Sequence, residues 1–246
     1  RECCRRLEIR NVSKSYQNKK VLHSLHIKLS HGIYALHGPN GAGKSTLMNI
    51  LCNQLTYEEG EVLYNGQAIG ALKKEYYRRL GYAPQQQGLY DEFSGERFLT
   101  YMALLKDIDK KRIPQEVERV AALVNMQPHL KQRCATYSGG MKQRLLVAQA
   151  LLGEPEILLF DEPTAGLDPK ERVSLRHVFE ALKEQHTLLI ATHVVSDVET
   201  IADEVVFLKQ GHLIAQGGVG ELLLRHPGID SLEKLYLKIF QEEQKE

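Results

Sequence analysis

The chain is short of cysteine, of long apolar runs and of net charge, and each shortage excludes a class of protein. Its 246 residues hold four cysteines, Cys3, Cys4, Cys52 and Cys134, none spaced as C-x-x-C. Neither a zinc site nor a disulfide framework is therefore predicted. No apolar run approaches the ~18 residues of a membrane-spanning helix, so we expect no span in this chain. No signal peptide is visible either.

The charges are balanced, which argues against a nucleic-acid partner. Lys and Arg total 32 and Asp and Glu total 31, for a net charge of +1. A broad nucleic-acid surface needs an excess of positive charge. Hydrophobic residues make up 43% and charged residues 26% of the chain. These fractions predict a globular protein, and the length suits one large domain or a domain with an inserted lobe.

The strongest local pattern runs from His37 to Thr46 and reads HGPNGAGKST, which fits G-x-x-x-x-G-K-[ST]. A short apolar run precedes it and a helical pattern follows, and this context predicts a phosphate-binding loop. The glycines let backbone N–H groups face phosphate oxygens, and the helix adds its positive N-terminal end. Lys44 is expected to reach the β- and γ-phosphates, and Ser45 to hold Mg²⁺. The expected nucleotide-binding residues of this loop are Gly38, Pro39, Asn40, Gly41, Ala42, Gly43, Lys44, Ser45 and Thr46.

The flanking patterns predict an α/β core with an inserted helical lobe. Strands are expected at residues 7–9, 25–29, 80–84, 157–160, 188–191, 205–208 and 213–215, with a hairpin turn at 65–66 and a polar loop at 13–20. Helices are expected after the phosphate loop, at 72–79, within 94–126, from 138, at 170–184 and from 217 onward. In the lobe, Phe98, Tyr101, Met102 and Leu105 are expected to form one buried stripe, and Val117, Val120, Ala121 and Val124 another. Ser196 and Glu199 resemble a capping box for a short helix.

Two acids and a histidine follow buried strands at the same edge of the predicted sheet. Asp161 and Glu162 come directly after strand 157–160, and His193 follows strand 188–191. Buried acids cost free energy unless a metal or a water network uses them. Ligands of open α/β sheets bind at those strand ends, so we interpret the acids as site residues. A lone histidine is usually structural, but the position of His193 favours a role in the same site.

These motifs occur in a specific order along the chain: an aromatic loop, GPNGAGKST, a glutamine after a strand, a helical lobe, YSGGM, ILLFDEP, AGLD and a histidine after a strand. From Leu7 to about Gln216, this order resembles the ATP-binding subunit of ABC transporters. The resemblance implies a P-loop NTPase (RecA-like) core with a mainly parallel sheet, an N-terminal antiparallel β subdomain and an inserted α-helical subdomain. It implies a single domain, with the catalytic core at residues 1–86 and 138–217, the helical subdomain at 87–137 and a helical tail at 218–246.

The resemblance also implies roles for residues around one ATP and one Mg²⁺. Glu162 would be the general base, His193 would contact the γ-phosphate, and Lys44 would complete the catalytic set. Ser45, Gln85 and Asp161 would serve the metal, with Gln86 and Gln87 as less favoured neighbours of Gln85. Tyr16 would stack on adenine, although its position alone equally suits a plain surface tyrosine.

Other positions are implied to act on a second subunit. Ser138, Gly139, Gly140 and Met141 correspond to the family's signature loop, which binds the γ-phosphate of ATP held by the other subunit. The family pattern is L-S-G-G-Q, so Tyr137 and Met141 depart from it. Ser138 by itself would equally be a plain helix cap. Asp168 would lie at the interface between the two subunits.

The function implied is a motor subunit that binds and hydrolyses ATP to drive transport. Its partners would be a second ATPase subunit, identical or closely related, and a separate integral membrane subunit docked near residues 90–93. The chain would then be cytoplasmic and peripheral on the inner face of the cell membrane. The sequence YSGGMKQRL and the short tail favour export. A soluble ABC-type ATPase of translation or chromosome maintenance is disfavoured by the single unit and the charge of +1, and a non-hydrolysing switch by the presence of Glu162 and His193.

Overall fold

The computed structural model describes residues 7–17, 19–85 and 88–241. Its central six-stranded sheet has the order β10-β9-β3-β8-β7-β6. The strands are β3 (Gly32–His37), β6 (Leu80–Ala83), β7 (Ile157–Asp161), β8 (Thr187–Thr192), β9 (Glu204–Lys209) and β10 (His212–Gly217). All pair in parallel except β10, which is antiparallel to β9, so the predicted mainly parallel sheet is confirmed. Both β3 and β8 are buried along their whole length, as parallel strands covered on two faces must be.

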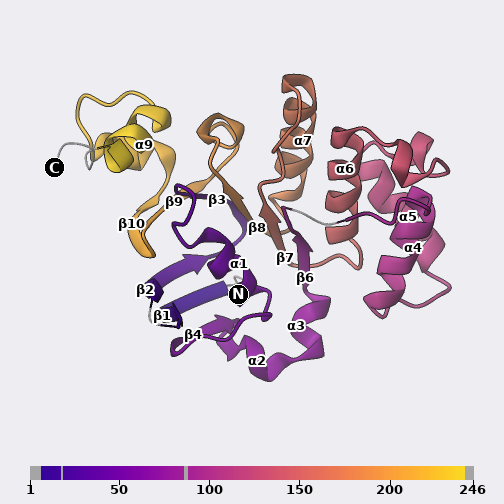
Figure 1. Ribbon diagram of the computed structural model, residues 1–246, viewed down its shortest axis with the longest axis horizontal. Coiled ribbons are helices and arrows are strands. Elements are labelled where there is room, and N and C mark those ends of the chain that lie inside the picture. The colour runs from indigo at the N-terminus through magenta and orange to yellow at the C-terminus, as the bar shows by residue number, and fades with distance from the viewer. Residues whose placement is uncertain (1–6, 18, 86–87, 242–246) are drawn as a thin grey trace.

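An antiparallel sheet of four strands, in the order β2-β1-β4-β5, lies beside the central sheet (Figure 1). Its strands are β1 (Leu7–Tyr16), β2 (Lys19–Leu29), β4 (Glu59–Tyr64) and β5 (Gln67–Ala68). The polar loop predicted at residues 13–20 is wrong, because β1 continues to Tyr16 and β2 begins at Lys19. Cross-strand pairing and an ion pair of 2.9 Å between Lys14 Nζ and Glu58 Oε1 hold this polar stretch extended. The hairpin turn at Asn65-Gly66 is confirmed, with positive φ at both residues.

The helices are α1 (Lys44–Leu51), α2 (Ile69–Leu72), α3 (Lys74–Arg78), α4 (Gly95–Leu105), α5 (Ile113–Leu123), α6 (Gly139–Ala150), α7 (Pro169–Leu182), α8 (Val219–Leu224) and α9 (Leu232–Gln241). The helix predicted at 72–79 corresponds to α3 and is shorter than expected, because Lys73, with a φ of 49°, separates it from α2, which ends at Leu72. The capping box predicted at Ser196 is also wrong. That segment is a 3₁₀ turn (Val195–Asp197), and Glu199 Oε1 instead accepts a hydrogen bond of 2.9 Å from the Leu232 N–H. Within the described residues, no helix has both the length and the apolar character that a bilayer span needs.

The central sheet separates two apolar cores. Tyr34 and Leu36 of β3 face the core shared with α1 and the antiparallel sheet, whereas Ile33 and Ala35 face the core shared with the helices on the other side. The predicted stripe on α5 is buried as expected. The stripe on α4 is only half right. Phe98 is buried and Met102 packs against the core as expected, but Tyr101 and Leu105 are 38% and 64% exposed, and Leu99 and Ala103 are buried instead. The result is a lobe of α4 and α5 that projects from the sheet on the side of α6 (Figure 1).

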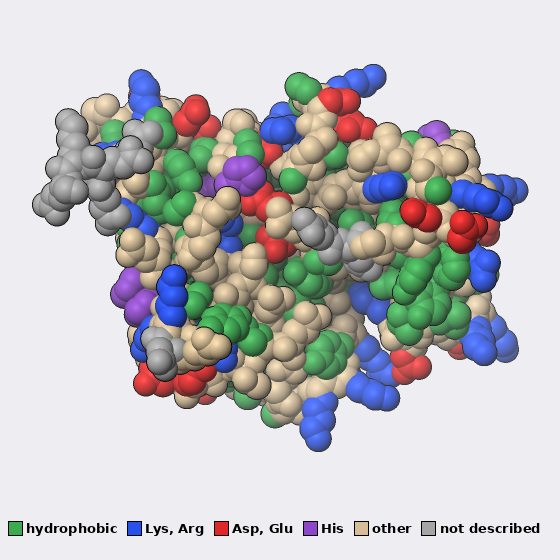
Figure 2. All heavy atoms as spheres, in the orientation of Figure 1, with side chains coloured by type: hydrophobic (Ala, Val, Ile, Leu, Met, Phe, Trp, Pro, Cys, Tyr) green, Lys and Arg blue, Asp and Glu red, His purple; other side chains and the backbone are tan. Residues whose placement is uncertain are grey.

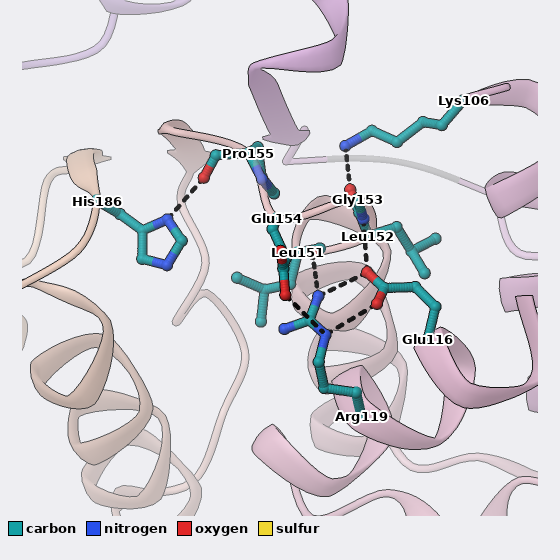
Figure 3. Close-up of polar contacts among 9 residues, drawn as sticks. All are labelled: Lys106, Glu116, Arg119, Leu151, Leu152, Gly153, Glu154, Pro155 and His186. Atoms are coloured by element: carbon teal, nitrogen blue, oxygen red, sulfur yellow. Dashed lines mark hydrogen bonds and ion pairs between the residues drawn. The ribbon is translucent and has the colours of Figure 1, made fainter. Parts of the chain in front are cut away.

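A polar network fastens this lobe to the end of α6 (Figure 3). The last carbonyls of an α-helix have no partner within the helix. Lys106 Nζ donates to the Leu152 carbonyl at 2.7 Å, and Arg119 donates to the Leu151 carbonyl at 3.0 Å. Glu116 accepts from the Gly153 N–H at 2.6 Å and pairs with Arg119. The lobe therefore holds α6 at the end opposite its first residues, Gly139 and Gly140.

Candidate functional site

The segment between β3 and α1 forms a tight loop at the carboxyl ends of the strands of the central sheet. A Cβ atom on Gly38 would lie 2.3 Å from the Leu208 carbonyl oxygen, so no larger residue fits there. Gly43 has a φ of 104° and stands at the start of α1, where a side chain would be strained. These positions explain why the loop requires its glycines. The loop and the first turn of α1 then present backbone N–H groups to one side, as an anion site needs.

Lys44 folds back across this loop. Its Nζ atom donates to the Gly38 carbonyl at 2.5 Å and to the Pro39 carbonyl at 3.3 Å. Burial lowers the pKa of Lys44, and the charges of Glu162 and Asp161 oppose that shift. A buried ammonium held by neutral carbonyls gains more from an anionic partner, so a phosphate entering the loop would compete well for it.

A cavity of about 270 Å³ opens in front of the loop. This is at the small end of small-molecule sites, which typically span roughly 300–1,000 Å³, and it suits a polyphosphate better than a whole nucleotide. Figure 2 shows acidic and histidine side chains gathered in the middle of this face. The lining residues are Val21, Pro39, Asn40, Gly41, Ala42, Gly43, Lys44, Ser45, Thr46, Gln85, Asp161, Glu162 and His193. Three separate predictions, the loop, the strand-end acids and the strand-end histidine, thus converge on one cavity.

Asp161 ends β7 and is buried beside the loop. Burial raises its pKa and the neighbouring charge of Glu162 raises it further, while a hydrogen bond with the Ser45 side chain acts in the opposite direction. Among the described residues, no group of three or more His, Cys, Asp or Glu side chains could hold a metal by itself. One carboxylate, one hydroxyl and the amide of Gln85 are nevertheless a suitable set for Mg²⁺, which keeps several waters and takes its other ligands from phosphates.

Glu162 and His193 form a pair at the rim of the cavity. His193 Nδ1 lies 2.9 Å from Glu162 Oε1, and the His193 backbone N–H donates to Glu162 Oε2 at 3.4 Å. Glu162 has a φ of 50°, in the left-handed region that a glutamate rarely adopts. Its own N–H donates to the Ala191 carbonyl of β8 at 2.8 Å, which holds that conformation. Such strain is typical of residues whose position serves a site.

The predicted signature loop lies elsewhere, at the start of α6. Ser138 caps this helix, and its Oγ accepts from the Met141 N–H at 3.2 Å. A Cβ atom on Gly140 would lie 1.8 Å from Glu171 Oε1, so the loop lies directly against α7. Asp168 caps α7 and accepts from the Glu171 N–H at 2.8 Å. The signature loop and Asp168, which are both expected to act on a second subunit, are therefore neighbours. None of the described residues that line the cavity comes from either segment.

Glu171 was missed in the sequence, although its position three residues after the cap Asp168 is a recognisable helix-start signal. The contacts of Tyr137 and Met141 explain why these two residues differ from the family pattern. Tyr137 is buried, and its hydroxyl donates to the His129 carbonyl at 2.7 Å. Met141 is half-buried and packs against the main core. Both side chains thus pack against buried parts of the chain and support the signature loop.

Tyr16 and Gln85 differ in how the structure places them. Gln85 is exposed and lines the cavity, while Gln86 and Gln87 lie outside the described residues. Tyr16 is 45% exposed at the end of β1, with Lys14 Nζ 5.5 Å from its ring centroid, and it does not line the cavity.

The chain matches the family model described as "ABC transporter" over residues 22–165. It is 34% identical over 218 residues to the uncharacterized ABC transporter ATP-binding protein YxlF of Bacillus subtilis, covering 88% of this chain and 72% of that protein. It is 32% identical over 232 residues to the lantibiotic transport ATP-binding protein SrtF of Streptococcus pyogenes, covering 94% and 95%.

Solved structures agree with the sequence relatives. The fold is similar to that of an ATP-binding subunit of an ABC transporter, with a TM-score of 0.84, 27% identity and coverage of 95% of this chain and 98% of that one. It is also similar to a bacterial Atm1-family ABC exporter with ATP bound, with a TM-score of 0.79, 26% identity and coverage of 99% and 42%. The predicted P-loop NTPase fold is confirmed. The chain belongs to the ABC transporter family, as an ATP-binding subunit that hydrolyses ATP.

Proposed function

We propose that this chain hydrolyses Mg²⁺-ATP in the cavity of about 270 Å³ and thereby drives an exporter whose membrane part is a separate subunit. The observation that carries the proposal is the convergence of Lys44, Asp161, Glu162 and His193 on that one cavity. Relatives named for lantibiotic transport and for Nod factor export support the direction. We infer that the chain then works at the inner face of the cell membrane, held there by its partner.

Glu162 would orient the attacking water and take its proton. Lys44 and the loop N–H groups would bind the β- and γ-phosphate oxygens, and His193 would turn from Glu162 toward the γ-phosphate. Fixed donors of this kind lower the barrier by stabilising the charge that develops on the phosphoryl oxygens. Mg²⁺, held by Ser45 and through water by Asp161, would supply further neutralisation of that charge.

The chain would supply only half of each complete site. Ser138 and Gly139 are exposed at the N-terminus of α6, beside Asp168, and none of them lines the cavity. A helix N-terminus binds anions well. We therefore infer that this surface completes the ATP site of a second subunit, so that ATP joins two subunits and hydrolysis releases them. Because only the γ-phosphate would touch both halves, ATP and ADP would favour different populations of the closed pair.

The membrane subunit would dock between the core and the lobe. A second cavity there has a volume of about 600 Å³ and is lined by Asn49, Cys52, Gln54, Tyr77, Leu80, Tyr82, Pro84, Met102, Leu105, Lys106, Gln149 and Ala150. Leu105 of this lining is exposed, as are Tyr101 and Leu104 of the same helix, and hydrophobic side chains gather on this part of the lobe (Figure 2). Tyr90 and Phe93, from the segment predicted to dock, pack together at a tilted angle, with ring centroids 5.0 Å apart, and extend the apolar area. A short helix of a membrane subunit fits such a groove.

The test measures phosphate release by the full chain and by its Glu162→Gln and Glu184→Gln variants. The exposed Glu184 serves as the matched control. We expect Glu162→Gln to abolish turnover while it retains ATP, and to shift to a dimer on a sizing column when ATP is added. Equal turnover in Glu162→Gln and the parent would refute the assigned base. A monomer at every ATP concentration would refute the two-subunit site.

A further inference from the structure

His37 has no assigned role in the site, yet it lies beside both of its main parts. It is the last residue of β3 and directly precedes Gly38 of the phosphate loop. It is also paired in register with Thr192, the last residue of β8, which directly precedes His193. One fully buried side chain thus stands where the phosphate loop and the catalytic histidine both leave the sheet.

The imidazole of His37 makes a specific contact across these two strand ends. Its Nδ1 atom lies 2.9 Å from the Thr192 carbonyl oxygen. Because a carbonyl can only accept, Nδ1 must carry the proton. Burial lowers the pKa of His37 to about 4, so the ring is neutral at ordinary pH. The side chain therefore donates to the Thr192 carbonyl at the point where the backbone hydrogen bonds between β3 and β8 end.

The other ring nitrogen, Nε2, shows that this orientation of the His37 ring costs free energy. No partner for His37 Nε2 occurs among the described residues, although the atom is buried. A buried polar atom without a partner is unfavourable, and an apolar side chain would avoid it. The contact of Nδ1 with the Thr192 carbonyl is what a histidine provides here and an apolar side chain would not.

The C-terminal helix closes over the same ring. The His37 ring lies 6.0 Å from that of Phe207 in β9 and 6.4 Å, edge-on, from that of Tyr236 in α9. Tyr236 itself packs against Phe240 at a tilted angle, with ring centroids 4.4 Å apart. These contacts fix the plane of the imidazole and exclude water from it. The orientation of Nδ1 toward Thr192 is thereby maintained.

We propose that His37 is a positioning residue for ATP hydrolysis, which holds the Thr192 carbonyl and so sets the place of His193 beside Glu162. The chain of contacts is short: His37 Nδ1 to the Thr192 carbonyl, one peptide unit to His193, and His193 Nδ1 to Glu162 Oε1 at 2.9 Å. This inference rests on the roles proposed above for His193 and Glu162. Loss of the donor should slow turnover, because the γ-phosphate contact would be misplaced, and should change ATP binding little.

The test compares His37→Leu, which keeps bulk without a donor, with His37→Asn, whose amide N–H can occupy the place of Nδ1–H. His31→Leu, at the exposed turn before the same strand, is the matched control. We expect His37→Leu to lower kcat about 10-fold with KM for ATP within about 2-fold, and His37→Asn to recover most of kcat. The melting temperature of each variant is measured first, and turnover is compared at a temperature at which all variants are folded.

A second arm repeats His37→Leu in a His193→Ala background, where the substitution should have no further effect because both act on one contact. The inference is overturned if His37→Asn and His37→Leu lose activity alike, if only KM rises, or if the two losses multiply. Failure of the proposed function has a different signature, namely equal turnover by the parent chain and by Glu162→Gln.

Discussion

The imidazole of His193 is 2.9 Å from the carboxylate of Glu162, and the two residues come from the ends of adjacent parallel strands. In the proposed mechanism Glu162 is the general base, and this contact would occupy its carboxylate. His193 would then have to exchange its contact with Glu162 for one with the γ-phosphate, which would leave the carboxylate free to take a proton from water. On this proposal the observed pairing is the arrangement before ATP binds.

Lys44 should govern ATP affinity. Its ammonium is held by two backbone carbonyls of the loop, and a triphosphate would replace these with charged oxygens. Hydrogen bonds to charged groups contribute about 1.5–3 kcal/mol each. We therefore expect Lys44→Ala to weaken ATP binding by roughly 10- to 100-fold. Titration with a fluorescent ATP analogue measures this, and the exposed Lys131→Ala should bind like the parent chain.

Tyr137 and Gly95 should be energetically coupled. A Cβ atom on Gly95 would lie 2.3 Å from the Tyr137 hydroxyl oxygen, which itself donates to the His129 carbonyl. Tyr137→Phe alone should cost about 1 kcal/mol of unfolding free energy, the typical value of one hydrogen bond. Gly95→Ala alone should cost more, because it forces the buried ring to move.

The double variant tests whether the two substitutions act on one contact between Tyr137 and Gly95 or destabilise the chain independently. With the hydroxyl removed, the nearest remaining ring atom, Cζ, would lie 3.3 Å from a Cβ atom at Gly95, so most of the clash is relieved. We expect the loss in Gly95→Ala/Tyr137→Phe to be smaller than the sum of the single losses by roughly 1 kcal/mol or more. Urea unfolding of the four proteins measures the coupling, and simple additivity would contradict the assigned contact.

Lys106 should make the free energy of unfolding depend on pH in the alkaline range. Burial lowers its pKa to about 8 in the folded chain, against an ordinary value of 10.5, while the charge of Glu116 opposes the shift. Between these values the unfolded chain binds more protons than the folded one, so the contribution of Lys106 to stability rises as pH increases from 8 to 10.5.

The measurement is urea unfolding of the parent chain and of Lys106→Met at pH 7.5 and pH 9.5. We expect the parent to gain stability relative to Lys106→Met at the higher pH. The exposed Lys110→Met is the control and should follow the parent. A parallel response in Lys106→Met and the parent would contradict the burial of the Lys106 ammonium at its place in the network of Figure 3.

Much of the site could be predicted because its signals are local. The phosphate loop is one continuous motif, and the positions of Asp161, Glu162 and His193 follow from short apolar runs that end at one edge of a parallel sheet. The same reasoning failed at residues 13–20, where strand pairing and the contact of Lys14 with Glu58 outweigh a polar composition. Lys14 and Glu58 are 44 positions apart, so the hydrophobic pattern of residues 13–20 does not reveal their contact.

His37 and Tyr137 show what sequence patterns could not supply. In the sequence His37 is the first letter of a motif that does not specify it, and its neighbour Tyr236 is about 200 positions away. Tyr137 reads as a departure from a family pattern until its place beside Gly95 is seen. Both depend on contacts between distant segments, which a single sequence does not encode in any periodicity.

Each ATP site is proposed to need residues of two subunits, and a mixing experiment tests this most directly. Glu162→Gln keeps an intact signature loop but lacks the base, whereas Ser138→Arg keeps the base but obstructs the loop. Each variant alone should be inactive. Mixed in equal amounts with ATP, they should regain phosphate release, because half of the sites in mixed dimers combine an intact Glu162 with an intact Ser138. If the activity of the mixture stays at the sum of the activities of the two separate variants, the two-subunit ATP site is contradicted.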